Sequence, residues 1–117
     1  MSMTFYEMAE RAKQEGKYML AARLYRISYM YWENEDFPPY DMRGLNLYGN
    51  YEDCCKKLDN KEQKILQIEE REFTDESVVY GSYFNWDWKD CVKNQLQIIM
   101  NENPEMKETI DILLKFV

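Results

Sequence analysis

The hydrophobic residues that follow Gly16 fall on two opposite sides of a predicted helix over residues 17–33. One stripe consists of Tyr18, Ala22, Tyr25, Tyr29 and Trp32, and the other consists of Leu20, Leu24, Ile27 and Tyr31. The stripes are offset by two residues, which corresponds to about 200° around a helix at roughly 100° per residue. A helix that is apolar on opposite sides needs a neighbour on each side. We therefore expect this segment to lie in the middle of an all-helical domain.

A shorter amphipathic helix is predicted immediately before it, over residues 5–15. Thr4 and Glu7 have the spacing of a capping box, in which each side chain satisfies a free backbone N–H at the start of a helix. The apolar side of this helix is formed by Phe5, Met8, Ala9 and Ala12. Gly16 is expected to end it, because glycine adopts the left-handed conformation without steric cost. A turn this short predicts that the two helices form an antiparallel hairpin.

Four further helices are predicted after the hairpin. Their ranges are residues 42–58, 60–72, 86–102 and 104–116. Asp59 followed by Glu62 again has capping-box spacing, and Asn103 precedes Pro104 at the position where proline favours a helix start. Gly49 lowers the helix propensity of the first range, so a break near this residue remains open. The 60–72 helix presents Ile65, Leu66 and Ile68, is otherwise charged, and is expected on the surface.

Two segments lack a helical pattern. Residues 34–40 contain Pro38-Pro39, which cannot continue a helix, and they are expected to form a loop. Residues 73–85 are rich in β-branched and aromatic residues, and they suit either an irregular loop or a hairpin that turns at Gly81-Ser82. The chain of 117 residues has the size of one domain. The sequence thus predicts a single compact all-α bundle of five to six helices that begins with an antiparallel hairpin.

A short pattern recurs once along the chain. Gly16-Lys17-Tyr18-x-x-Ala21-Ala22 is followed 33 residues later by Gly49-Asn50-Tyr51-x-x-Cys54-Cys55. A period near 34 is typical of solenoids built from helical hairpins. The recurrence is either the trace of such a repeat or a chance match of a few positions.

Residues 4–45 resemble two kinds of helical protein. Small and aromatic residues occur where the tetratricopeptide helix pair places them, at Ala9, Gly16, Tyr18, Ala21 and Tyr25. The same stretch is similar to the ANR family of small bacterial regulators, which restrain AraC-type activators, in Ala9, Glu15-Gly16, Tyr18, Ala21-Ala22 and Leu24-Tyr25. The resemblance implies a regulator that acts by touching other proteins, with no cofactor and no catalytic residue.

The net charge of the chain is −7, and its isoelectric point is about 4.7. Direct binding to nucleic acid needs clustered lysine and arginine side chains, so the overall charge argues against such a partner. The charge is also uneven, because residues 1–32 carry five bases and three acids whereas residues 33–117 carry ten bases and nineteen acids. The first hairpin is therefore expected to be mildly basic and the remainder acidic.

The sequence contains no histidine. This excludes Ser-His-Asp and Cys-His nucleophile pairs and the metal sites that need imidazole. Cys54, Cys55 and Cys91 supply at most three thiolates, and adjacent cysteines diverge by about 100° on a helix. We therefore interpret them as small core residues and predict a protein that is not an enzyme and needs no cofactor or metal.

Three features predict the compartment. The cysteines do not form a disulfide framework, no signal sequence precedes the first helix, and no apolar run is long enough to span a bilayer. We expect a cytoplasmic protein without membrane contact.

Two neighbouring clusters are candidate partner-binding sites. Five acids lie within eight positions, at Glu69, Glu70, Glu72, Asp75 and Glu76. An aromatic cluster follows, at Tyr80, Tyr83, Phe84, Trp86 and Trp88. Tryptophan and tyrosine dominate binding hot spots because they bury a large area with few rotamers to fix. The acids form either a solvated helix end or a patch for a basic partner, and the rings either fill the core or join an interface.

These features favour a non-enzymatic module that regulates another protein by binding it, such as a small bacterial or phage regulator. The alternative is a phage or mobile-element inhibitor of a CRISPR-type defence nucleoprotein, whose carboxylates imitate nucleic acid. A homodimer is compatible with either function, because surplus aromatic surface on small helical proteins can be buried against a second copy.

Overall fold

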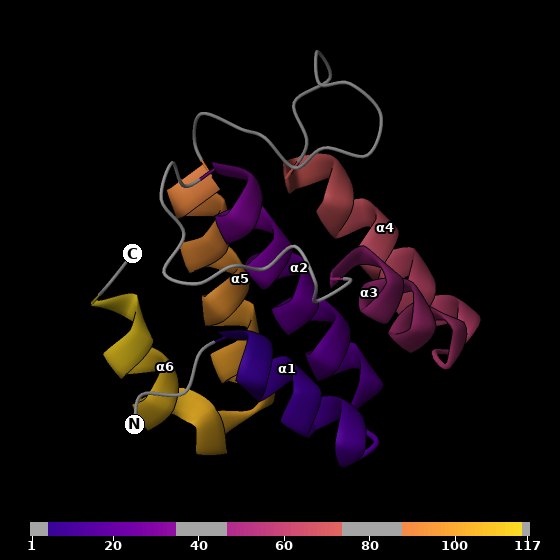
Figure 1. The fold of residues 1–117 in the computed structure, drawn as a ribbon, viewed down its shortest axis with the longest axis horizontal. Coiled ribbons are helices and arrows are strands. Elements are labelled where there is room, and N and C mark those ends of the chain that lie inside the picture. Colours follow the sequence, from indigo (N-terminus) through magenta and orange to yellow (C-terminus); the bar gives the residue numbers. More distant parts are fainter. Residues whose placement is uncertain (1–4, 35–46, 74–87, 116–117) are drawn as a thin grey trace.

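The computed structural model describes residues 5–34, 47–73 and 88–115, and this part of the chain is helical with no strand. The elements are α1 Phe5–Gln14, α2 Tyr18–Asn34, α3 Leu47–Lys56, α4 Asn60–Phe73, α5 Trp88–Glu102, the short 3₁₀ helix η1 Pro104–Met106 and α6 Lys107–Leu114. They form a bundle with α2 at its centre and with α4 and α6 at opposite edges (Figure 1). The predicted all-α class is confirmed.

The hairpin of α1 and α2 forms as predicted, and Gly16 makes the turn. Gly16 has a φ of +77°, in the left-handed region that favours glycine. Its N–H donates to the carbonyl of Lys13 at 3.1 Å, and the N–H of Lys17 donates to the carbonyl of Ala12 at 2.9 Å. These two bonds close a Schellman motif, which satisfies carbonyls at the end of α1. Thr4 of the predicted capping box lies outside the described residues.

The central helix α2 is buried on both predicted sides. It packs against α1, α3 and α5. Buried residues from the two stripes are Leu20, Ala22, Leu24, Tyr25 and Ile27, and Tyr18 and Tyr29 are partly buried. The structure does not describe the side chains of Tyr31 and Trp32. The pattern failed to predict one feature, which is that Arg23 and Arg26, between the stripes, are buried as well.

The helix predicted at 42–58 is observed as α3, and its predicted first residues lie outside the described part of the chain. Gly49 lies inside α3, so the helix does not break there. The two halves of the recurring pattern also differ in structure, because Gly16 makes a turn between helices whereas Gly49 is helical.

The start of α4 is confirmed, since the N–H of Glu62 donates to Oδ1 of Asp59 at 2.8 Å. Of the three apolar residues that α4 was expected to present, Leu66 is buried, whereas Ile65 and Ile68 are 37% and 52% exposed. Beyond Phe73, residues 74–87 lie outside the description, so the alternatives for 73–85 stay open.

The C-terminal helix differs from the prediction at its start. The segment is divided into η1, which begins at Pro104, and α6. Asn103 does not cap it, because its side chain donates instead to the carbonyl of Ile99 at 3.1 Å, back toward α5. Ile110 from α6 joins Val92, Leu96 and Ile99 of α5 in the core.

Candidate functional site

Two arginines of α2 are the most deeply buried charged residues that the structure describes. Arg23 is 2% exposed and Arg26 is 1% exposed. They are three residues apart, so they lie on one face of α2, one turn from each other. A buried guanidinium is costly unless an anion and hydrogen-bond acceptors surround it. Their partners come from α4 and α5.

Glu69 of α4 is the shared anion. Arg23 approaches its carboxylate in a fork, with Nε donating to Oε1 at 3.3 Å and Nη2 donating to Oε2 at 2.9 Å. Nη2 of Arg26 donates to the same Oε1 at 2.6 Å. Bidentate arginine–carboxylate contacts of this kind combine strength with directional specificity.

Gln95 of α5 and the backbone of α4 complete the environment. Arg26 donates through Nη1 to the carbonyl of Leu66 at 3.2 Å, and its Nη2 also donates to Oε1 of Gln95. Gln95 in turn donates through Nε2 to Oε1 of Glu69 at 3.5 Å. We call Arg23, Arg26, Glu69 and Gln95 the buried ion cluster. At its edge, Nη1 of Arg23 donates to the half-exposed carboxylate of Glu102.

The electrostatics of the cluster favour the ionised forms of Glu69 and Arg23. Burial raises the pKa of the Glu69 carboxyl, but hydrogen bonds and charges from Arg23 and Arg26 outweigh it and hold the pKa below its usual value. Burial lowers the pKa of Arg23, and hydrogen bonds to Glu69 and Glu102 raise it above its usual value. An ionised Glu69 whose oxygens are already occupied is suited to holding α2, α4 and α5 together and not to proton transfer.

This geometry corrects the interpretation of the acidic cluster. Glu69 is 8% exposed, so it is not part of an exposed acidic row. Glu70 and Glu72 lie in the last turn of α4 and Trp88 begins α5, but their side chains are not described. The other candidates lie outside the described residues: Asp75, Glu76, Tyr80, Tyr83, Phe84 and Trp86. Their role as partner-binding residues stays a prediction.

The cluster also changes the expected charge distribution. Arg23 and Arg26 account for the surplus of bases in residues 1–32. Since both are buried against Glu69, this surplus does not reach the solvent. The hairpin is basic in composition, but the exposed surface of its described residues is not.

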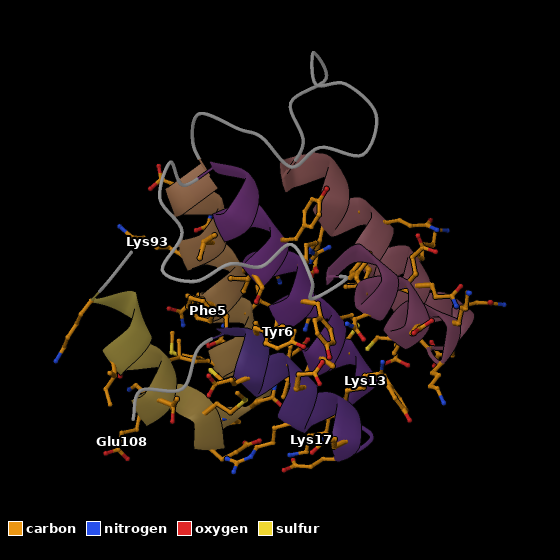
Figure 2. All side chains as sticks on the ribbon, in the orientation of Figure 1. Phe5, Tyr6, Lys13, Lys17, Lys93 and Glu108 are labelled. Atoms are coloured by element: carbon orange, nitrogen blue, oxygen red, sulfur yellow. The ribbon has the colours of Figure 1, made fainter. Side chains whose placement is uncertain are left out.

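A second buried polar group joins α1 to α2. Tyr25 is fully buried, its hydroxyl donates to Oε1 of Glu10, and its ring meets that of Tyr6 edge-on at 6.2 Å. Burial, reinforced by Glu10, raises the pKa of Tyr25. Lys13, on the same helix as Tyr6 (Figure 2), donates to Oδ1 of Asn50 at 3.0 Å and so joins α1 to α3.

Two open depressions lie on the surface of the described part. One, of about 320 Å³, lies between α3 and α4 and is lined by Tyr51, Glu52, Cys55, Lys56, Gln63, Leu66 and Gln67. The other, of about 310 Å³, lies between α1, η1 and α6 and includes Met8, Arg11, Glu105 and Met106. Both volumes are at the lower limit for small-molecule pockets, and neither is lined by a member of the buried ion cluster.

The sequence contains a signal for the buried ion cluster, but the helical pattern alone did not predict the cluster. Arg23 and Arg26 lie between the two apolar stripes of one helix. If both stripes are buried, side chains between them are close to burial too, and arginines there need an acidic partner. The identity of that partner, Glu69, was not available from local spacing.

Within the described residues, no helix is long and apolar enough to cross a membrane, and no group of three or more cysteine, aspartate or glutamate side chains is arranged to hold a metal ion. No protein family, curated protein or solved structure matches this chain. The resemblance of residues 4–45 to tetratricopeptide pairs and to the ANR family therefore stays a prediction.

Proposed function

We propose that this chain is a non-enzymatic module that binds another polypeptide through the outer face of α4. The observation that supports the proposal is the exposure of Ile65 and Ile68, at 37% and 52%. The two residues are three positions apart and so lie on one face of the helix. Neighbouring large apolar side chains in contact with water are a common mark of an interaction surface.

The inner face of α4 fixes the position of this surface relative to the rest of the bundle. Leu66 is buried in the core, and Glu69 is held by Arg23 and Arg26. A helix anchored in this way loses little conformational freedom when a partner binds to its other face. Lys61 and Lys64 are exposed on the same helix, so the described part of the surface is basic around its apolar centre.

Further sequence candidates come next in the chain. Glu70 and Glu72 follow on the same helix, and the aromatic residues 80–88 lead into α5. We propose that Glu72, which is four positions after Ile68, and the aromatic residues belong to the same binding surface. The buried ion cluster supports this proposal, because it holds α4 and α5 against α2. These two helices precede and follow residues 74–87 in the chain.

Site-specific photo-crosslinking tests the binding surface. A photoreactive amino acid is placed at position 68 of the full chain, and a matched control carries it at Ile112 of α6, which is 49% exposed. In a bacterial lysate we expect adducts from position 68 and none from position 112. With the photoreactive amino acid at position 61 instead, the otherwise unchanged chain should also form adducts. The double variant Ile65→Glu with Ile68→Glu, carrying the same probe at position 61, should not. Equal adducts from positions 68 and 112 would contradict the proposal.

The alternative function is an inhibitor that acts as an anionic decoy, in which carboxylates imitate nucleic acid. This is a narrower form of the same proposal, and the burial of Glu69 weighs against it. A decoy needs a row of solvated carboxylates, and Glu69 is neutralised by two arginines. Glu70→Lys with Glu72→Lys tests what remains of the row. The matched control is Glu108→Lys with Asp111→Lys, which changes the net charge equally on α6, at the opposite edge of the bundle (Figure 2). If the chain acts as a decoy, added salt and the Glu70→Lys with Glu72→Lys variant should each abolish inhibition of the target nucleoprotein. The control pair on α6 should leave inhibition unchanged.

A further inference from the structure

The charges that the structure describes on the outer face of α4 are all positive. The exposed charged and large apolar residues on this face are Lys61, Lys64, Ile65 and Ile68. At roughly 100° per residue, both lysines lie within about 40° of the direction opposite the buried Leu66. The acids in the described part of the helix are directed elsewhere, because Glu69 is buried and Glu62 is half-buried.

Neither lysine has an acidic neighbour one turn away on the helix, where a carboxylate could pair with it. The positions three and four residues before and after Lys61 and Lys64 hold Lys57, Leu58, Asn60, Gln67, the two isoleucines and the two lysines themselves. Among the described residues, neither ammonium group forms a salt bridge, whereas Lys17 pairs with two carboxylates. Two like charges one turn apart disfavour a helix slightly, so a carboxylate from outside the chain would relieve their repulsion.

The charge of the whole molecule limits the kind of anion that can approach. An extended anionic surface, such as a membrane or a nucleic acid, meets much of a chain whose net charge is −7. A short polypeptide segment along α4 is influenced mainly by charges within about 8 Å, the Debye length at physiological salt. The exposed isoleucines also need apolar contacts, which side chains of a polypeptide supply and a phosphate backbone does not.

We propose that the partner is an acidic segment of another polypeptide, which packs apolar side chains against Ile65 and Ile68 and places carboxylates against Lys61 and Lys64. This inference rests on the proposed function, because it names the chemistry of the partner of the same face. The two lysines lie in the first two turns of α4. We therefore expect the acidic end of the segment there, away from Glu72 in the last turn.

Synthetic peptides test this chemistry on the purified full-length chain. Three peptides of 14 residues, the length of α4, share one pair of leucines three positions apart and carry glutamate, glutamine or lysine at the flanking positions. Fluorescence anisotropy should show that the glutamate peptide binds about tenfold more tightly than the glutamine peptide, which is the gain expected from two exposed ion pairs. The lysine peptide should not bind.

A charge swap tests whether the two lysines cause this preference. Lys61→Glu with Lys64→Glu should lose binding to the glutamate peptide and acquire binding to the lysine peptide. Because both positions are exposed, the circular dichroism spectrum of the variant should match that of the wild type. The matched control is Lys93→Glu with Lys107→Glu, which makes the same change of net charge at exposed positions of α5 and α6 and should leave the preference unchanged.

Peptide affinities that do not depend on charge would overturn the proposal. Equal affinity for the glutamate and glutamine peptides, no binding to any peptide, or a glutamate preference that survives the charge swap would each do so. Vesicles of phosphatidylserine and phosphatidylcholine test the other anionic partner. Binding to these vesicles without binding to the glutamate peptide would identify a membrane contact and refute an acidic polypeptide.

Failure of this inference can be distinguished from failure of the proposed function. Photo-crosslinks from position 68 that form equally in the wild type and in the charge-swapped variant would leave the binding face standing and refute an acidic partner. Absence of adducts from position 68 in the wild type, together with absence of peptide binding, would refute both.

Discussion

The pKa values of two buried acidic groups in this bundle are shifted in opposite directions. Glu69 is buried between two guanidinium groups, and the pKa of its carboxyl is lowered although burial alone would raise it. Cys54 is fully buried, and burial raises the pKa of its thiol to about 11 although the charge of Lys13 acts to lower it. The nearest charges therefore decide whether a buried group stays ionised.

The thiol of Cys54 should react slowly. Its pKa of about 11, compared with an ordinary value of 9.0, leaves about 100-fold less thiolate at neutral pH, and only the thiolate is nucleophilic. We expect iodoacetamide to label Cys54 at least that much more slowly in the folded chain than in denaturant. Peptide mass spectrometry can follow each site, with the half-buried Cys55 as the internal comparison. Equal labelling rates in the folded and unfolded chain would contradict this.

Gly16 should resist replacement for a reason of backbone conformation alone. A Cβ built at this position meets nothing within 4 Å, but φ is +77°. Gly16→Ala should therefore destabilise the chain by about 1 kcal/mol, which is the cost of a left-handed L-residue. Urea unfolding followed by circular dichroism measures it, and Gln14→Ala, an exposed change at the end of α1, is the control. An unchanged midpoint for Gly16→Ala would show that the turn tolerates a side chain.

At the scale of elements, α4 is attached differently from the others. The described side chains of α4 include one buried apolar residue, Leu66, whereas α5 contributes Val92, Leu96 and Ile99. Most of the polar attachment of α4 passes through Glu69 to Arg23 and Arg26. Removing one partner of a buried ion pair is far more costly than removing an exposed one. Glu69 therefore makes a large contribution to holding α4 on the bundle.

Glu69→Gln should lower the stability of α4 more than that of α2. Loss of the shared anion leaves two buried guanidinium groups poorly compensated, and we expect a destabilisation of about 3 kcal/mol. Amide hydrogen exchange should show that α4 loses protection at lower denaturant than α2.

The control for this change is Glu105→Gln. Glu105 is exposed, and its carboxylate lies 4.0 Å from the ammonium group of Lys17. An exposed pair of this kind contributes at most about 1 kcal/mol. If the Glu69 and Glu105 variants lose equal stability, the buried ion cluster does not hold α4 in place.

At the scale of the whole molecule, the cluster makes stability depend on pH. The pKa of Glu69 is lower in the folded chain than its ordinary value of 4.5. Between these two values the unfolded chain binds more protons than the folded one, so folding becomes less favourable as the pH falls. The contribution of Glu69 is complete above about pH 5 and is lost as the pH falls through the folded-state pKa.

This predicts a difference in slope between two proteins. The free energy of unfolding of the wild type should fall from about pH 5 downward. That of Glu69→Gln, which has no carboxyl at this position, should fall less over the same pH range. Urea unfolding at a series of pH values measures both curves. Parallel curves for the two proteins would mean that other carboxylates account for the acid sensitivity.

Helix positions were predictable from the sequence because the hydrogen bonds that form them are local. Apolar spacing located α1, α2 and α5, and Gly16 marked the turn, since each signal lies within a few residues of the feature it controls. The start of α6 was less predictable, because Asn103 had a competing acceptor at the end of α5.

Only the tertiary structure decided which charged residues are buried. Arg23 and Glu69 are 46 positions apart, and Arg26 and Gln95 are 69 apart. No local pattern selects Glu69 from its acidic neighbours in the sequence. The choice depends on the packing of the helices, which brings Leu66 and Glu69 of α4 against the two arginines. Sequence spacing therefore determined the helices of this protein, and their packing determined which of its charges form the core.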